Sequence, residues 1–153
     1  MNTSAPIPMV FDSSAVLSWL LQECGRWQKV DKLLRSDRID RVLPTAALTE
    51  VIYKAAEAGN TAGPDRIAAL MSSYLRLADI TTADAQWAGD RIAESRRNPV
   101  PAESGGQPHT LSLGDGLVLA VADRLQAPAV TFDDVWGRFP TMKFRLISPY
   151  KVP

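Results

Sequence analysis

A short apolar segment near the start of the chain ends on an acid and passes directly into a helical pattern. Residues 9–11 (MVF) predict a brief buried strand, and apolar residues over 15–20 then repeat at helical spacing. Asp12 therefore lies at a strand-to-helix corner. In an open parallel sheet such a corner lies at the carboxyl end of the strand, where ligands bind in the crevice above the sheet. A plainer alternative is that Asp12 or Ser13 only caps the following helix.

Side-chain direction separates the two serines that follow this acid. In an extended segment residues two apart share a direction, so we expect Ser14 to point into the crevice with Asp12. We expect Ser13, between them, to turn away. This arrangement would place one hydroxyl beside the first acid.

The rest of the chain alternates helices with short apolar strands. Helices are predicted over 26–35, 44–58, 63–75, 82–96 and 112–126, and strands over 41–43, 129–132 and 145–147; residues 77–80 are either a short strand or a connector. This alternation predicts an α/β fold with a mainly parallel central sheet flanked by helices. The length of 153 residues and the 46% hydrophobic fraction suit a single domain, with a core of about residues 9–147.

Composition changes abruptly before the last predicted helix. Residues 98–110 hold three prolines and two glycines, which predicts a flexible loop that is long enough to act as a mobile flap. His109, the only histidine, lies in this loop without a partner at metal-ligand spacing, so we expect a solvent-facing side chain. Cys24 is the only cysteine, which excludes a disulfide or a cysteine-based metal cluster within one chain.

Charge and hydropathy narrow the function classes further. Seventeen basic and seventeen acidic residues give a formal charge of zero, so no global field attracts nucleic acid. The longest apolar runs fall far below the ~18 residues that a membrane-spanning helix needs. The first nine residues lack the basic start and apolar stretch of a secretory signal, so we expect a cytoplasmic protein without membrane association.

Three further acids lie at comparable corners of the predicted fold. Glu50 falls near the edge of the core face of its helix, and Asp115 lies in the first turn of a largely apolar helix. One of the adjacent pair Asp133 and Asp134 ends a buried strand. Because strand ends and helix starts of a parallel sheet lie along one edge, these carboxylates can converge with that of Asp12.

Two of these acids also have a purely structural explanation. Glu50 precedes Lys54 by four residues, which is the favourable order for an exposed ion pair on a helix. Ser112 and Asp115 match a capping box, in which the acid folds back onto the amide of the cap.

The neighbours Asp133 and Asp134 differ only in side-chain direction. If the strand continues to the corner, Asp133 shares a face with Thr131, whereas Asp134 follows Phe132 on the opposite face. We therefore expect Asp133 to join the other acids. Asp134 would then cap a short helical turn that begins near residue 135.

Carboxylates gathered without histidine or cysteine are typical of a site for a hard divalent cation. Without a cation, carboxylates a few Å apart repel one another and take up protons, whereas Mg²⁺ and Mn²⁺ favour oxygen ligands. One or two such ions lower the pKa of bound water and neutralise charge on a reacting phosphodiester. Ser14 and Thr131 would not bind the ion themselves; their hydroxyls would orient the carboxylates or bind water.

The segments VFDSSAV, LTEV, LSLGDGLVLAVA and VTFDDVW, in this order, resemble the PIN domain family. More narrowly, they resemble the VapC-type toxins of bacterial toxin–antitoxin systems, and the likeness runs from about residue 9 to residue 147. The resemblance implies catalytic and metal-binding roles for four acids, Asp12, Glu50, Asp115 and Asp133. It matches Ser14 and Thr131 to the hydroxyl residues that accompany the first and last of these acids.

The function that this resemblance implies is the toxin of a type II toxin–antitoxin system. Such a toxin is a Mg²⁺- or Mn²⁺-dependent endoribonuclease, usually a homodimer, that a VapB-type antitoxin inhibits. The substrate would be a structured cellular RNA such as tRNA or rRNA.

Three other functions fit less of the pattern. Haloacid-dehalogenase-like phosphatases also begin with an Asp at a strand end, but they need a second Asp two residues later, where this chain has Ser14. A receiver-like phosphoacceptor needs an acidic pair before its phosphorylated Asp and a late Lys, whereas the paired acids of this chain come last. A PIN fold retained only for protein binding would have lost acids, and all four are present.

Overall fold

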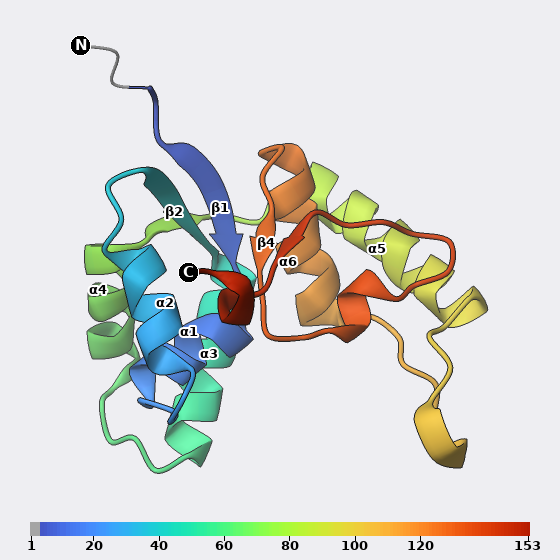
Figure 1. Ribbon diagram of the computed structural model, residues 1–153, viewed down its shortest axis with the longest axis horizontal. Coiled ribbons are helices and arrows are strands. Elements are labelled where there is room, and N and C mark those ends of the chain that lie inside the picture. Colours follow the sequence, from blue (N-terminus) through green and yellow to red (C-terminus); the bar gives the residue numbers. More distant parts are fainter. Residues whose placement is uncertain (1–3) are drawn as a thin grey trace.

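The central sheet is entirely parallel in the computed structural model, which describes residues 4–153; the first three residues of the predicted domain lie outside it. Within this range five strands follow the order β3-β2-β1-β4-β5 (Figure 1). Their bounds are Ile7–Phe11 (β1), Ile39–Pro44 (β2), Arg76–Ala78 (β3), Ala129–Val130 (β4) and Leu146–Ile147 (β5). Each neighbouring pair is parallel. The predicted α/β fold with a parallel sheet is therefore confirmed.

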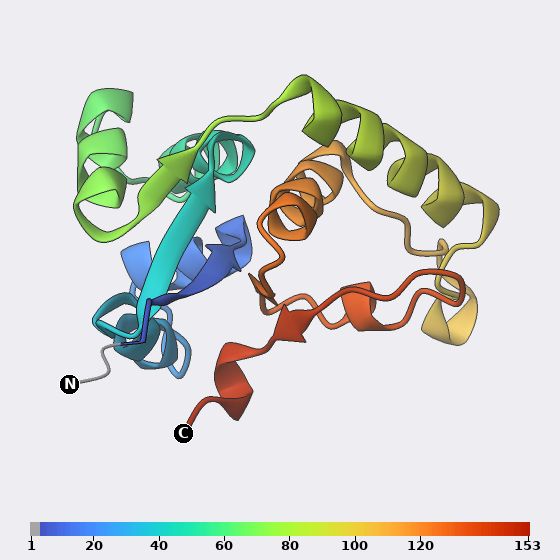
Figure 2. The same ribbon diagram turned by 90° about the horizontal axis from the view of Figure 1, so that it is seen from above.

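Six α-helices in the same range connect and cover these strands. They are α1 (Ser13–Leu20), α2 (Trp27–Leu34), α3 (Thr45–Glu57), α4 (Pro64–Tyr74), α5 (Thr82–Arg97) and α6 (Leu113–Arg124). Short 3₁₀ turns are η1 (Glu103–Gly105), η2 (Val135–Gly137) and η3 (Pro149–Lys151). Figures 1 and 2 show α1 to α4 around the half of the sheet that holds β1, β2 and β3, and α5 packed along α6 on the other half.

The order of the strands creates one crevice at the carboxyl edge of the sheet. From β1 the chain winds outward to β2 and β3, and it then returns through α5 and α6 to β4 on the other side of β1. The winding direction thus reverses between β1 and β4, and ligands of open α/β sheets bind at such a switch point. Phe11 of β1 pairs with Val130 of β4, so the residues that follow these two strands face each other.

The position of β1 in the middle of the core explains why residues 9–11 are all apolar. Val10 and Phe11 are fully buried because helices cover both faces of this central strand. Leu34, Leu43 and Met71 are among the largest buried side chains of the same core. β4 is shorter than predicted and ends at Val130, so the residues after it are free to bend.

An ion pair with one buried partner joins α5 to α6. Asp84 is 2% exposed and forms a capping box with Thr81 at the start of α5. Its carboxylate also accepts hydrogen bonds from Arg124 of α6, the shortest at 3.0 Å. Burial alone raises the pKa of Asp84, but the hydrogen bonds from Arg124 and Thr81 outweigh it and hold the pKa below its ordinary value.

Residues 98–110 leave the body of the fold and return to it. The amide of Val100 donates to the carbonyl of His109 at 3.0 Å, and the reverse bond is 2.8 Å, so the two ends of the loop are tied together. The side chain of His109 is exposed, as expected. The flexibility of the loop stays a prediction.

In residues 4–153, helix length and hydropathy leave no candidate for a membrane-crossing segment.

Candidate acidic site at the carboxyl edge of the sheet

Asp12 lies directly after β1 and is held by two hydroxyls. Ser14 Oγ donates to Asp12 Oδ2 at 2.8 Å, and Thr131 Oγ1 donates to the same oxygen at 2.9 Å. The residue is only 5% exposed. Burial raises the pKa of Asp12 to about 6 even though both hydroxyls lower it, and the charge of Asp115 adds to the rise. The structure therefore holds a costly buried carboxylate at the switch point.

Ser13 also faces the acids, so the prediction that it turns away is wrong. Its Oγ donates to Glu50 Oε2 at 3.0 Å and lies 3.5 Å from Asp12 Oδ1. The alternation of an extended segment does not apply here because α1 begins at Ser13 itself. Asp12 occupies the N-cap position of α1, but its side chain makes no capping hydrogen bond within the described residues.

Glu50 projects from α3 toward the start of α6. Its Oε2 accepts from Ser13 and from Lys54 Nζ, the latter at 3.1 Å, so the ion pair expected from the sequence is formed. A methyl group at Gly114 would overlap Glu50 Oε1 and would lie 3.1 Å from Glu50 Cδ. The Glu50 carboxylate thus occupies the space that a side chain at position 114 would need.

Asp115 interacts electrostatically with each of the other three acids. Burial raises the pKa of Asp115, hydrogen bonds from Ser112 lower it, and the negative charges of Asp133 and Glu50 add to the rise. The charge of Asp115 in turn raises the pKa of Asp12. Asp115 therefore lies near each of the other three acids.

The capping box predicted for Asp115 is formed as well. The Asp115 amide donates to Ser112 Oγ at 3.1 Å, and the Ser112 amide donates to Asp115 Oδ2 at 3.0 Å. This cap engages one carboxylate oxygen of Asp115. One side chain can therefore fix the start of α6 and belong to the acidic site.

Asp134 occupies the N-cap position of η2, but its side chain makes no capping hydrogen bond within the described residues, so the prediction that Asp134 caps this turn is wrong. The amide of Val135 donates to Asp133 Oδ1 at 2.9 Å, and the Asp133 amide donates to Thr131 Oγ1 at 3.0 Å. These bonds bend the chain directly after Val130, so strand alternation does not continue to the corner.

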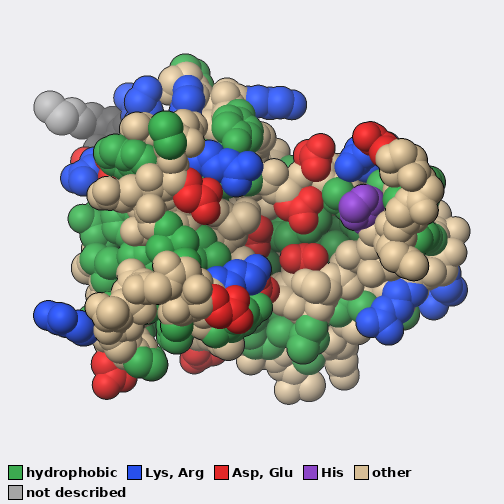
Figure 3. All heavy atoms as spheres, turned by 90° about the horizontal axis from the view of Figure 1, so that it is seen from below, with side chains coloured by type: hydrophobic (Ala, Val, Ile, Leu, Met, Phe, Trp, Pro, Cys, Tyr) green, Lys and Arg blue, Asp and Glu red, His purple; other side chains and the backbone are tan. Residues whose placement is uncertain are grey.

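The two neighbours nevertheless differ in their relation to the other acids. The charge of Asp133 acts on Asp115, whereas the side chain of Asp134 is 88% exposed and only approaches Arg138, at 3.9 Å. Figure 3 looks onto this edge of the molecule and shows acidic side chains gathered near its middle, with Lys and Arg side chains around them.

The donor set suits a hard divalent cation, although it is not preassembled. Over residues 4–153, no group of three or more His, Cys, Asp or Glu side chains stands at a spacing that could already hold a metal ion. The acids contribute only carboxylate oxygens, which Mg²⁺ and Mn²⁺ prefer. Burial and mutual repulsion raise the pKa of Asp12 and Asp115, and a bound cation would relieve both costs.

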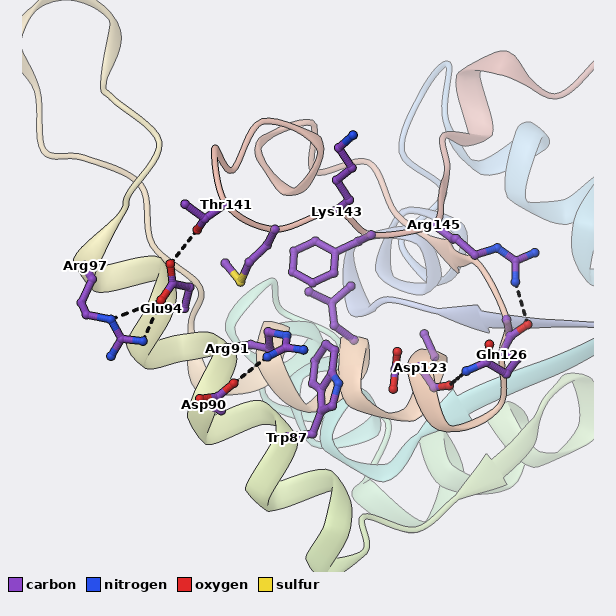
Figure 4. Close-up of a pocket in the computed structure, with 15 residues that line it drawn as sticks. Trp87, Asp90, Arg91, Glu94, Arg97, Asp123, Gln126, Thr141, Lys143 and Arg145 are labelled. Atoms are coloured by element: carbon purple, nitrogen blue, oxygen red, sulfur yellow. Dashed lines mark hydrogen bonds and ion pairs between the residues drawn. The ribbon is translucent and has the colours of Figure 1, made fainter.

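A pocket of about 540 Å³ lies away from these acids, between α5, α6 and residues 141–145 (Figure 4). None of the four acids lines it. Much of its charged rim is already paired, for example Asp90 with Arg91 and Glu94 with Arg97. Crowded carboxylates, two of which have a raised pKa, indicate function more strongly than this pocket does, so we place the candidate site at the acids.

A model of the PIN domain family matches residues 9–141. The chain belongs to the PIN domain family. The predicted family resemblance is thereby confirmed, and the single PIN domain accounts for the α/β architecture. A search of curated proteins finds no match.

Several solved structures share the fold of this PIN domain. A toxin–antitoxin complex from Klebsiella pneumoniae aligns with a TM-score of 0.63 and 17% identity, covering 97% of this chain and 100% of that chain. VapC20 from Mycobacterium tuberculosis, a sarcin-ricin loop cleaving toxin, aligns with a TM-score of 0.65 and 16% identity, covering 82% of this chain and 90% of that chain. DNA-bound VapBC from Salmonella typhimurium aligns with a TM-score of 0.62 and 19% identity, covering 94% of this chain and 98% of that chain.

Two residues that contact the acids were not found from the sequence. Strand alternation points Ser13 away from the site, but its position in the first turn of a helix is a signal that alternation fails there. Gly114 carried a signal too, because glycine is a poor helix former and stands directly before Asp115 in the first turn of α6.

Proposed function

We propose that this PIN domain is a metal-dependent endoribonuclease and the toxin of a type II toxin–antitoxin system. The observation that supports the proposal is a buried acid, Asp12, at the switch point between β1 and β4, with Asp115 near enough to Asp12, Glu50 and Asp133 for their charges to interact. The structural likeness to VapC20, a sarcin-ricin loop cleaving toxin, supports structured RNA such as rRNA or tRNA as the substrate class.

Four acids would hold Mg²⁺ or Mn²⁺ in this proposal, namely Asp12, Glu50, Asp115 and Asp133. Such an ion, when bound, supplies an acidified water and neutralises charge on the phosphodiester. The residues around the acids orient them. Ser14 and Thr131 fix Oδ2 of Asp12, and Ser13 with Lys54 fixes Oε2 of Glu50.

The proposed partner is a VapB-type antitoxin, and the proposed assembly of the toxin is a homodimer. Structures of toxin–antitoxin complexes with this fold support an antitoxin partner. An antitoxin blocks an acidic metal site most directly with an arginine, because its guanidinium binds carboxylates through two parallel hydrogen bonds. Such an arginine would compete with the divalent ion.

The test is RNA cleavage by the purified protein. We expect the wild type to cut cellular RNA with Mg²⁺ or Mn²⁺ and to stop when EDTA is added. Asp12→Asn should abolish cleavage yet melt at no lower temperature, because asparagine can still accept from both hydroxyls and no longer buries a charge. Metal-independent cleavage, or a fully active Asp12→Asn variant, would refute the proposal; no cleavage at all would favour a non-catalytic PIN or receiver-like binding module.

A further inference from the structure

Three side chains from distant parts of the chain form an aromatic cluster, defined as Arg26, Phe132 and Tyr150. The rings of Phe132 and Tyr150 meet edge to face with their centroids 4.9 Å apart. The Arg26 guanidinium lies 4.9 Å from the centre of the Phe132 ring and 5.8 Å from that of Tyr150. Arg26 Nε also donates to Tyr150 Oη at 2.7 Å, so the three side chains form one connected surface.

The aromatic cluster lies at the same edge of the sheet as the acids. Phe132 follows β4, and η3, which carries Tyr150, follows β5. Arg26 directly precedes α2, which packs against η3 (Figure 1). Phe132 is also the residue before Asp133, and its amide donates to Ser14 Oγ at 3.2 Å. One serine hydroxyl therefore ties the cluster to the acid site.

Two members of the cluster are open to solvent, whereas Phe132 is half-buried against the core. Tyr150 is 53% exposed, and the Arg26 side chain is 42% exposed. The nearest acid to the Arg26 guanidinium is Glu23, at 3.6 Å, which leaves a loose surface ion pair. Exposed aromatic rings and guanidinium planes are the surfaces on which unpaired nucleobases stack.

We propose that the aromatic cluster binds an unpaired nucleobase of the RNA, next to the phosphate at the acids. The proposal rests on the proposed nuclease function. Phe132 directly precedes Asp133 in the chain, and its amide bonds the serine that holds Asp12, so the stacked base would belong to a nucleotide near that phosphate. A base inside a duplex is stacked on its neighbours and unavailable, so the cluster selects loops and other unpaired segments.

A purely structural role of the cluster makes a different prediction. If these side chains only anchor η3, their removal lowers the melting temperature and weakens all ligands equally. If they stack a base, their removal acts on ligands that carry bases and spares those that do not. The experiment therefore compares two ligands rather than one.

We would measure binding in the uncleaving Asp12→Asn background with a short single-stranded oligoribonucleotide and a fully abasic chain of equal length and charge. The protein should prefer the ligand with bases by about ten-fold or more. Tyr150→Ala should reduce that preference to near unity, whereas Tyr150→Phe, which retains the ring, should keep most of it.

Arginine variants at the two ends of α2 provide a matched control. Arg26→Gln should lower the preference because it removes one stacking plane. Arg35 is 64% exposed and pairs with Asp31 at 2.8 Å, outside the cluster, so Arg35→Gln should leave the preference unchanged.

An unchanged preference in Tyr150→Ala, or equal weakening of both ligands, would overturn the inference whatever happens to the melting temperature. Cleavage by the wild type reports separately on the proposed function. If the wild type cuts RNA and Tyr150→Ala keeps the preference, only the base-binding inference fails. If the wild type cuts no RNA but Tyr150→Ala loses the preference, the base site stands and the nuclease proposal fails.

Discussion

Gly114→Ala tests whether the observed position of Glu50 is its working position. The added methyl would overlap Glu50 Oε1, which is the end of a flexible side chain and can move, so the fold should survive. An ordinary contact distance requires that oxygen to retreat by about 1.5 Å. A displacement of that size at a reacting group lowers the rate by roughly 10²-fold.

The expected stability change is small because two effects oppose each other. Replacing glycine by alanine stabilises a helix by up to about 1 kcal/mol. Loss of the hydrogen bonds that Glu50 accepts from Ser13 and Lys54 costs about 1 kcal/mol. The free energy of unfolding of Gly114→Ala should therefore stay within about 1 kcal/mol of the wild type.

The assay is RNA cleavage at saturating Mg²⁺ beside urea unfolding, with Gly89→Ala as the matched control. Gly89 lies in α5, and a methyl group there would meet no atom within 4 Å. Gly89→Ala should gain about 1 kcal/mol and cleave like the wild type. Wild-type cleavage by Gly114→Ala would refute the reasoning, because it would mean that Glu50 does not act from this position.

Asp133→Asn should lower RNA cleavage far more than Asp134→Asn at saturating Mg²⁺, and equal losses would overturn the choice between these neighbours. Asp84→Asn should cost about 2 kcal/mol at pH 7, less than a fully buried pair, because Arg124 is 36% exposed. Since the pKa of Asp84 is lowered on folding, its contribution is present above the unfolded pKa and lost as pH falls through the folded pKa. The urea midpoints of Asp84→Asn and wild type should thus converge below about pH 4, and a constant gap would contradict this. Antitoxin affinity should fall when Mg²⁺ is added, and the fall should shrink in Asp115→Asn; an unchanged difference would argue for inhibition away from the acids.

Alternation of apolar strands and helices was sufficient to predict the parallel sheet and the position of Asp12 at its carboxyl edge. The contacts of Ser14 and Thr131 with Asp12 agree with the expectation that both hydroxyls lie beside this acid, although α1 begins at Ser13, so extended alternation is not the reason for the contact of Ser14. The capping box of Asp115 followed from local sequence spacing alone.

The predictions failed where extended backbone stops and hydrogen bonding fixes the geometry. Ser13 turns to the acids because α1 starts at Ser13, inside the segment for which extended alternation was assumed. Asp133 accepts the hydrogen bond from the Val135 amide because β4 ends at Val130. The contact between Glu50 and Gly114 joins two helices far apart in the sequence, and no local pattern encodes it.

Titration of the purified protein with Mn²⁺ tests the central claim that these acids form one metal site. Asp115→Asn is the decisive variant. Asparagine can still accept the capping hydrogen bond from the Ser112 amide, but the substitution removes the negative charge of Asp115. Asp123→Asn, near the other end of α6, is the matched control. We predict that Mn²⁺ binds the wild type and Asp123→Asn alike and binds Asp115→Asn at least about ten-fold more weakly. Equal Mn²⁺ affinity in all three proteins would contradict the account.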